Sequence, residues 1–155
     1  MFSYIMSPSN WGPPTWIFMH SLAANLKEDS FSVIGPSLIL LIIQISNNLP
    51  CPECAQHAKE FWSKVKTANI KNKTDLINLL FVFHNIVNKR KGYPPFKYDH
   101  LGYYNNKNII DTYNIFSRNF NTKGNMNLIN ESFHRNRLLS SLRTWIMTNI
   151  KHFTK

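Results

Sequence analysis

The sequence LPCPECA, residues 49–55, contains both cysteines of the chain, three positions apart. Pro52 suits the first turn of a helix, where its missing N–H would have no helical partner in any case. We therefore expect Cys51 at or just before a helix start and Cys54 one turn inside. The helix dipole and the free N–H groups would then lower a thiol pKa to about 7 or below. The two thiols can form a disulfide or share a metal or a cofactor, and the neighbouring residues must decide between these uses.

The composition suits one domain with a sizeable core, because 43% of the 155 residues are hydrophobic and 14% are aromatic. Two cysteines do not make a secreted disulfide framework, so their close spacing points to chemistry. The net charge of +10 is spread over several segments between asparagines, which argues against nucleic-acid binding. The N-terminus lacks the pattern of a cleaved secretory signal, and the longest apolar run, residues 38–43, is far shorter than a membrane span. We expect a soluble protein with no membrane span.

Hydrophobic periodicity and helix-ending residues predict an all-helical chain. The apolar segment 37–47 could be a buried helix or a buried strand by periodicity alone. The proline before it, the two asparagines after it and the lack of another convincing strand favour a helix. The expected helices are residues 15–27, 37–47, 52–66, 75–91, 106–116 and 130–153, the last one amphipathic.

Several polar side chains fall on the apolar faces of these helices. Trp16 and His20 lie one turn apart, and small residues follow on the same face, which leaves room for a flat group. Taken alone, His20 is better explained as a hydrogen-bonded core histidine than as a binding group. The same two interpretations apply to His84, Asn85 and Asn88, while His57 borders the helix face that carries Cys54.

The order of these clusters resembles that of the FAD-linked sulfhydryl oxidases of the Erv/ALR family. The matching motifs are Gly12 followed by Trp-x-x-x-His at 16–20, Pro-Cys-x-x-Cys at 50–54 with a histidine three residues on, and His-Asn-x-Val-Asn at 84–88. The start Trp-Gly-Pro at 11–13 resembles the versions carried by large cytoplasmic DNA viruses. The resemblance covers roughly residues 10–115, and the combination of motifs is specific.

The resemblance implies an all-α, FAD-binding four-to-five-helix bundle of the Erv/ALR type with an extra C-terminal amphipathic helix, usually as a homodimer. The expected divisions are an N-terminal arm at 1–10, an oxidase domain at 11–116 and a helical extension at 117–155. Cys51 and Cys54 would be the catalytic pair, and no metal is expected. The expected FAD-binding residues are Gly12, Trp16, His20, His57, His84, Asn85, Val87, Asn88, Lys91 and Tyr104.

By this resemblance, a substrate thiolate attacks the disulfide at the more exposed Cys51, and Cys54 leaves as a thiolate beside the flavin. FAD passes the electrons to molecular oxygen, which yields hydrogen peroxide. The chain has no second cysteine pair to act as a shuttle. The expected partner is therefore a thiol protein, such as a thioredoxin-like or Cys-x-x-Cys relay protein. The expected location is the cytoplasm of an infected host cell and the virion, with the mitochondrial intermembrane space as the alternative.

Some positions depart from the family pattern. Phe81 and Tyr98 stand where the family has a structural cysteine pair, so we expect an aromatic contact in place of the cross-link. Tyr93 stands where the family commonly has a lysine, which leaves the FAD phosphates to another cation. The candidates for that cation are Lys89, Arg90 and Lys91, and those for an absent family tryptophan are Tyr103, Tyr104 and Tyr113.

Two other interpretations stay open on the sequence. A noncatalytic basic interaction protein would carry the cysteines incidentally. A structural zinc module would lack the second compact ligand pair of an ordinary zinc finger. Its ligands would be Cys51, Cys54 and two of His57, His84 and His100.

Overall fold

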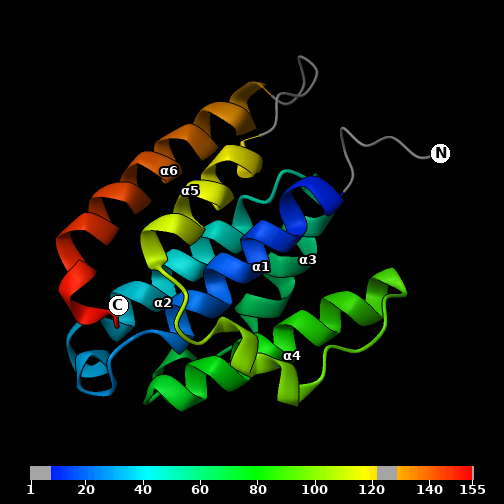
Figure 1. Cartoon of the computed structure of the whole chain (residues 1–155). Helices are drawn as coiled ribbons and strands as arrows, with labels where there is room; N and C mark the ends of the chain where they lie inside the picture. The colour runs from blue at the N-terminus through cyan, green and yellow to red at the C-terminus, as the bar shows by residue number, and fades with distance from the viewer. Residues whose placement is uncertain (1–7, 122–128, 155) are drawn as a thin grey trace.

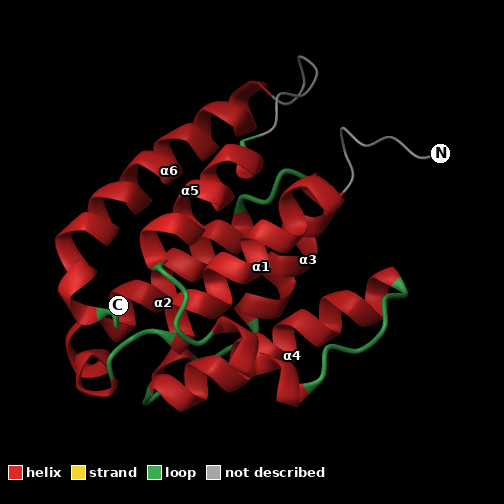
Figure 2. Cartoon of the chain, viewed as in Figure 1, coloured by secondary structure: helices red, strands yellow, loops and turns green. Residues whose placement is uncertain are grey.

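The structure, a computed structural model, describes residues 8–121 and 129–154 (Figure 1). In these two ranges the chain is helical, with an isolated β-bridge between Leu26 and Phe153 (Figure 2), which confirms the all-helical prediction. The α-helices are α1 (Pro8–Ala24), α2 (Phe31–Asn47), α3 (Pro52–Ser63), α4 (Lys73–Lys91), α5 (Ile109–Phe120) and α6 (Ile129–Asn149). The short 3₁₀ helices are η1 (Glu28–Ser30), η2 (Thr67–Asn69), η3 (Tyr98–Tyr104) and η5 (Ile150–His152).

Helix α1 begins well before the predicted start at Thr15 and contains Pro13 and Pro14. The predicted start was therefore wrong. A proline removes one backbone donor from a helix, but its fixed φ is close to the helical value, so a helix can continue through it where packing supports the helix. Trp11 and Thr15 are buried on the inner side of the helix. The Thr15 hydroxyl donates to the Trp11 carbonyl at 2.6 Å. This packing supports the helix across the two prolines.

Helix α2 also starts earlier than predicted, at Phe31, and Pro36 lies inside it. Its inner side chains, such as Leu38 and Ile42, are fully buried in the core. The segment Glu28–Asn47 is long and apolar enough to cross a membrane by length and composition, but more than half of it is buried inside the protein. The fold therefore uses α2 as a core helix.

The start of α3 and the end of α4 match the predictions and place the reactive residues, while α3 ends at Ser63 and α4 starts at Lys73, each slightly earlier than predicted. Cys51 is the N-cap of α3, and Pro52 is its first residue. The side chain of Asn72 caps α4 by accepting a hydrogen bond from Asp75 N at 2.8 Å. Gly92, at a φ of 74°, ends α4 in the left-handed conformation that glycine adopts readily. This turn sets the position of the basic residues in the last turn of α4.

The C-terminal helix α6 lies beside α5 and packs on α5 and α2 (Figure 1). Leu138, Leu142 and Ile146 belong to the same hydrophobic core as the residues of α1 and α2. The Tyr113 hydroxyl donates to the Leu139 carbonyl at 2.7 Å across the contact. The predicted division after residue 116 falls inside α5, and residues 8–10 of the predicted arm belong to α1.

Asn25 joins the end of α1 to η3 and to the C-terminal segment. Its side-chain amide donates to the Tyr104 carbonyl at 2.9 Å, and its side-chain oxygen accepts from Asn106 N at the same distance. Its backbone carbonyl accepts from Thr154 N at 2.8 Å. Asn25 is buried, so these bonds fix η3 firmly against α1. The chain from α6 onward therefore supports the segment that carries Tyr104.

Candidate functional site

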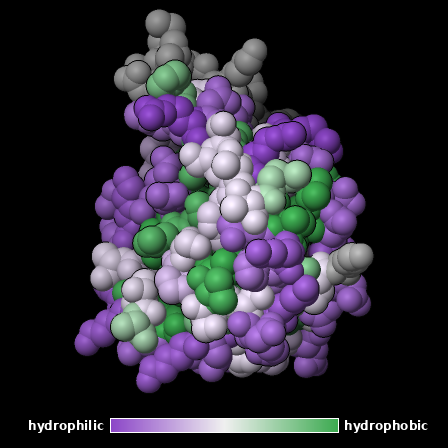
Figure 3. Space-filling model, turned by 90° about the vertical axis from the view of Figure 1, so that its left-hand side faces the viewer, coloured by the Kyte–Doolittle hydropathy of each residue, from purple (hydrophilic) through white to green (hydrophobic). Residues whose placement is uncertain are grey.

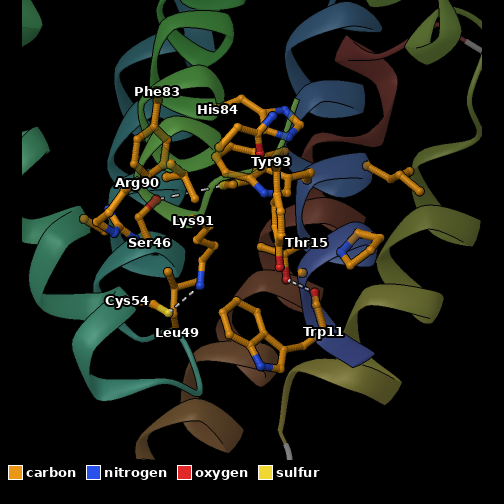
Figure 4. A pocket seen from close by; sticks show the side chains of 18 of the residues that line it. Trp11, Thr15, Ser46, Leu49, Cys54, Phe83, His84, Arg90, Lys91 and Tyr93 are labelled. Atoms are coloured by element: carbon orange, nitrogen blue, oxygen red, sulfur yellow. Dashed lines mark hydrogen bonds between the residues drawn. The ribbon is translucent and has the colours of Figure 1, made fainter. Parts of the chain in front are cut away.

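A cavity of about 520 Å³ lies between α1, α3 and α4, with the end of α2 and η3 completing its walls (Figure 4). Most of its lining is aromatic or aliphatic, and a thiol and a few polar groups are set among these side chains. A volume of this size with such a lining is typical of a small-molecule or cofactor site.

The two cysteines occupy different environments at the start of α3. Cys54 is buried, with 5% of its surface exposed, and lines the cavity. Cys51 is more exposed. Both are free thiols, and the Cys51 sulfur accepts a hydrogen bond from Cys54 N at 3.2 Å. The turn thus directs one sulfur toward the cavity and leaves the other accessible to a partner.

Burial and neighbouring groups set the electrostatics of Cys54. The pKa of its thiol is raised to about 11, by burial first and then by the neighbouring Cys51. The ammonium of Lys91, whose Nζ lies 3.5 Å from Cys54 Sγ, acts in the opposite direction. Desolvation of the buried thiolate is therefore the dominant influence on the pKa of Cys54.

One wall of the cavity is a stack of flat rings. The rings of Trp16 and His84 are parallel within 5°, and their centroids are 3.9 Å apart. Behind them, His20 Nε2 and His84 Nδ1 share a hydrogen bond of 2.9 Å, and the His20 ring stacks on Tyr104 with centroids 4.4 Å apart. Burial lowers the pKa of His20 to about 3 and that of His84 to about 4. Both rings are therefore neutral at physiological pH.

Helix α4 contributes a row of cavity residues at the spacing of one helix face, namely His84, Val87, Asn88 and Lys91. The Asn88 amide makes only a long contact of 3.4 Å to the Pro94 carbonyl. Arg90 and Tyr93 also line the cavity. This side of the cavity is thus the one that offers amide and cationic groups to a polar ligand.

The structure brings most of the predicted binding residues together, but three of them do not line the cavity. His20 stands behind the wall in contact with His84. His57 lies between two carboxylates of its own helix, at 3.7 Å from Glu53 and 3.8 Å from Glu60. Asn85 uses its side chain to bind both the N–H and the carbonyl of Phe96. The seven that do line it are Gly12, Trp16, His84, Val87, Asn88, Lys91 and Tyr104.

Other cavity residues were missed by the sequence reasoning. Trp11, Thr15 and Met19 line the cavity and lie four residues apart. A prediction that began the first helix before Trp11 would have placed all three on one helix face. Ser46 and Leu49 reach the cavity from the end of α2 and the following loop. No local pattern marks these two, because only the packing of α2 against α1 brings them there.

The aromatic contact expected in place of a cysteine pair is confirmed. The rings of Phe81 and Tyr98 meet edge to face, with centroids 5.2 Å apart. The Tyr98 hydroxyl also donates to the side-chain oxygen of Asn78 at 2.8 Å. These contacts tie η3 to α4.

The residues of the cavity fit a flavin cofactor better than a metal. A flat ring system would find the parallel rings of Trp16 and His84 on one side and the buried thiol of Cys54 among its neighbours. Arg90 and Lys91 offer positive charge for phosphate groups. Among the residues that the structure describes, no group of three or more histidine, cysteine, aspartate or glutamate side chains could hold a metal ion.

Comparison with known proteins points the same way. A model of the Erv1/Alr family matches residues 13–108, which is more than half of the chain. The FAD-linked sulfhydryl oxidase ERV1 of Oryza sativa subsp. japonica is 31% identical over 85 residues, or 55% of this chain and 43% of the rice protein. The FAD-linked sulfhydryl oxidase of African swine fever virus (isolate Tick/Malawi/Lil 20-1/1983) is 31% identical over 81 residues, or 52% of this chain and 67% of the viral protein.

A mitochondrial FAD-linked sulfhydryl oxidase of Schizosaccharomyces pombe is 27% identical over 86 residues, which are 55% of this chain and 47% of that protein. The chain thus spans less than half the length of the rice and yeast relatives. No solved structure matches the chain significantly.

Proposed function

The chain belongs to the Erv1/Alr family, and we propose that it is an FAD-dependent sulfhydryl oxidase that makes disulfide bonds in other proteins. The observation that carries the proposal is the position of the cysteine pair. Cys54 lines an aromatic cavity of about 520 Å³, while Cys51 remains more exposed at the start of the same helix. One sulfur is thus placed for a cofactor and the other for a protein substrate.

The residues proposed to hold FAD are those that line the cavity and can stack on it or hydrogen-bond to it. Trp16 and His84 offer aromatic surface, and Asn88 offers an amide. Tyr104 closes the cavity from η3, and Arg90 supplies a positive charge. His20, in contact with both His84 and Tyr104, supports this wall from behind. Bound FAD would supply a two-electron acceptor for a dithiol and would deliver the electrons to oxygen as hydrogen peroxide.

The cysteines would perform thiol–disulfide exchange before that transfer. A substrate thiolate attacks Cys51 Sγ in the Cys51–Cys54 disulfide, a new sulfur–sulfur bond forms, and Cys54 Sγ leaves with the electron pair. A second substrate thiolate then attacks the mixed disulfide and releases Cys51. The products of the exchange are an oxidised substrate and a reduced cysteine pair. Because Cys51 is the more exposed sulfur, the first attack is directed there.

We propose a protein thiol as the direct substrate, most simply a thioredoxin-like or Cys-x-x-Cys relay protein. The proposal is supported by the cysteine content, since the chain holds no second pair that could shuttle electrons to Cys51. Viral and mitochondrial proteins are both found among the relatives. We propose the cytoplasm of an infected cell as the site of action, by analogy with the viral relatives.

We also propose a homodimer, which exposed apolar side chains support. Val33 and Leu40 on α2 are 66% and 60% exposed. Figure 3, turned to show the side on which the C-terminus lies, also shows separate apolar patches between hydrophilic side chains. Exposed apolar side chains that form one contiguous patch mark protein contacts, and Val33 and Leu40 lie two helical turns apart on α2. Light scattering of the purified protein would give its mass, and a monomer at high protein concentration would contradict this proposal.

The visible spectrum of the purified protein tests the proposed function. We expect flavin absorbance and oxygen consumption with dithiothreitol. A colourless protein with one equivalent of bound zinc would support the zinc module instead. If the protein takes up no flavin after refolding with added FAD, the oxidase proposal is wrong.

A further inference from the structure

Lys91 has an unusual place for a lysine in this cavity. It lies in the last turn of α4, and its Nζ is 3.5 Å from Cys54 Sγ, as the dashed line in Figure 4 shows. The lysine is half-buried and the sulfur is buried. A cation at the C-terminal end of a helix is also favourably placed in the helix dipole. The contact therefore brings an ammonium group, whose charge the helix dipole stabilises, to a sulfur that is shielded from water.

The surroundings of Cys54 offer little other compensation for a negative charge. The cavity residues contributed by α1 and α2 include no ionisable side chain. Those contributed by η3 are Tyr103 and Tyr104, and burial raises the pKa of Tyr104 to about 12. On α4 and just after it, the ionisable residues that line the cavity are His84, Arg90 and Tyr93 besides Lys91, and burial keeps His84 neutral. Cys51 itself lies beside Cys54 on α3.

Thiol–disulfide exchange places a negative charge on this sulfur. When a substrate thiolate bonds to Cys51 Sγ, the Cys51–Cys54 bond breaks and its electron pair stays on Cys54 Sγ. Burial disfavours that thiolate, because a buried anion loses its hydration. A cation within about 4–6 Å favours the charged form of such a group by about 1–3 pKa units. Lys91 meets this distance condition.

We propose that Lys91 stabilises the Cys54 thiolate that forms when a substrate thiolate opens the Cys51–Cys54 disulfide. The proposal rests on the proposed function, since it assigns a role in the same exchange step. It also separates two neighbouring cations. Lys91 serves the sulfur, and Arg90, which lines the same cavity, is the cation left for the phosphate groups of the cofactor.

The test uses the full chain with Cys51→Ser, in which Cys54 is the only thiol. The rate of alkylation by iodoacetamide, measured against pH, gives the titration midpoint of Cys54 with and without bound FAD. In this background we expect Lys91→Met to raise the midpoint and so to slow alkylation at a fixed pH below it by about 10- to 1000-fold, and Lys91→Arg to keep both near the parent values. Lys89→Met is the matched control, because Lys89 is exposed and does not line the cavity. It removes the same charge without moving the midpoint.

Two further results distinguish the possible failures. A midpoint that is the same in Lys91→Met and in the parent overturns the proposal. So does a loss of bound flavin in Lys91→Met with no change in midpoint, since that result assigns Lys91 to the cofactor phosphates. A parent protein that binds no FAD refutes the proposed function, whereas the midpoint shift in the flavin-free chain still measures the Lys91–Cys54 interaction.

Discussion

The cavity and the contact of α6 with α5 and α2 are both built from buried side chains, but of different kinds. The cavity wall contains a buried thiol in contact with a lysine, and a neutral histidine that is hydrogen-bonded to a second one. The α6 contact is formed largely by leucine, isoleucine and phenylalanine side chains. Burial shifts the pKa of Cys54, His20 and His84 away from their ordinary values. Such shifts are typical of functional sites, whereas apolar contacts mainly stabilise the fold.

This difference predicts that changes in the cavity affect chemistry and that changes in α6 affect stability. The family match covers residues 13–108 and so includes the cavity, while α5 and α6 lie beyond it. Asn25 connects the two regions, because it binds both the Tyr104 backbone and the C-terminal segment. Substitutions in each region can therefore test whether the chemistry of the cavity and the stability given by α6 change independently.

The largest effect is expected at the cysteines. Cys54→Ser and Cys51→Ser should each reduce oxygen consumption by about a thousandfold or more, because loss of a reacting group usually costs at least that much. Cys51→Ser should also show the long-wavelength absorption of a thiolate beside oxidised flavin, and Cys54→Ser should not. The measurements are oxygen uptake with dithiothreitol and the visible spectrum. The reverse spectral result would exchange the roles of the two sulfurs.

A core leucine of α6 should give a large effect on stability alone. Leu142 is 1% exposed, so Leu142→Ala should lower the free energy of unfolding by about 2–5 kcal/mol. Oxygen uptake per folded molecule should stay within about twofold of the parent. Met147→Ala on the same helix is the control, because Met147 is 56% exposed and should change stability by less than about 0.5 kcal/mol. If Leu142→Ala impaired turnover while the protein stayed folded, α6 would contribute to the site.

The buried His20 and the half-buried His84 should make stability fall as the pH is lowered. In the unfolded chain their pKa values are about 6.5, whereas burial lowers that of His20 to about 3 and that of His84 to about 4. Between about pH 6.5 and pH 4 the unfolded chain binds more protons, so the free energy of unfolding decreases with falling pH. The decrease is at most about 1.4 kcal/mol per pH unit for each histidine.

Urea denaturation at several pH values across this window measures the slope. A variant with both His20→Phe and His84→Phe should lose this part of the pH dependence, and His100→Gln should keep it because His100 is exposed. An unchanged slope in the double variant would show that other groups cause the acid sensitivity.

The smallest effect is expected at the contact between α4 and η3. Phe81→Leu removes the edge-to-face pair with Tyr98 and should cost about 0.5–1.5 kcal/mol beyond the change in buried area. Thermal unfolding followed by circular dichroism measures this loss. The second variant, Tyr98→Phe, keeps the ring pair but removes the hydrogen bond to Asn78, and so separates the two interactions. If both variants matched the parent, the contact would not contribute to stability.

Local sequence patterns were sufficient for much of the fold. The helical class, the start of α3 at Pro52 and the end of α4 at Gly92 follow from proline, glycine and hydrophobic spacing. The starts of α1 and α2 did not follow, because Pro13, Pro14 and Pro36 lie inside helices that tertiary packing supports. Proline is a reliable signal of a helix start only where no buried face continues in front of it.

The candidate site was predictable to a similar degree. The helical spacing of His84, Val87 and Asn88 placed them on one face, and all three line the cavity. Asn85, from the same motif, instead binds the backbone of Phe96. His57 faces the carboxylates of Glu53 and Glu60. Periodicity indicates which residues share a face, but it does not say what lies opposite that face.

The sequence by itself determined that two thiols three positions apart begin a helix, with Cys54 one turn inside. The tertiary structure decided what surrounds them, because α1, α2 and α4 come from distant parts of the chain. Their packing buries Cys54 against an aromatic cavity and brings Lys91 to its sulfur. It also raises the pKa of the Cys54 thiol, first through burial. Spacing along the chain places atoms on a helix, whereas desolvation and charge depend on contacts that form only when the helices pack together.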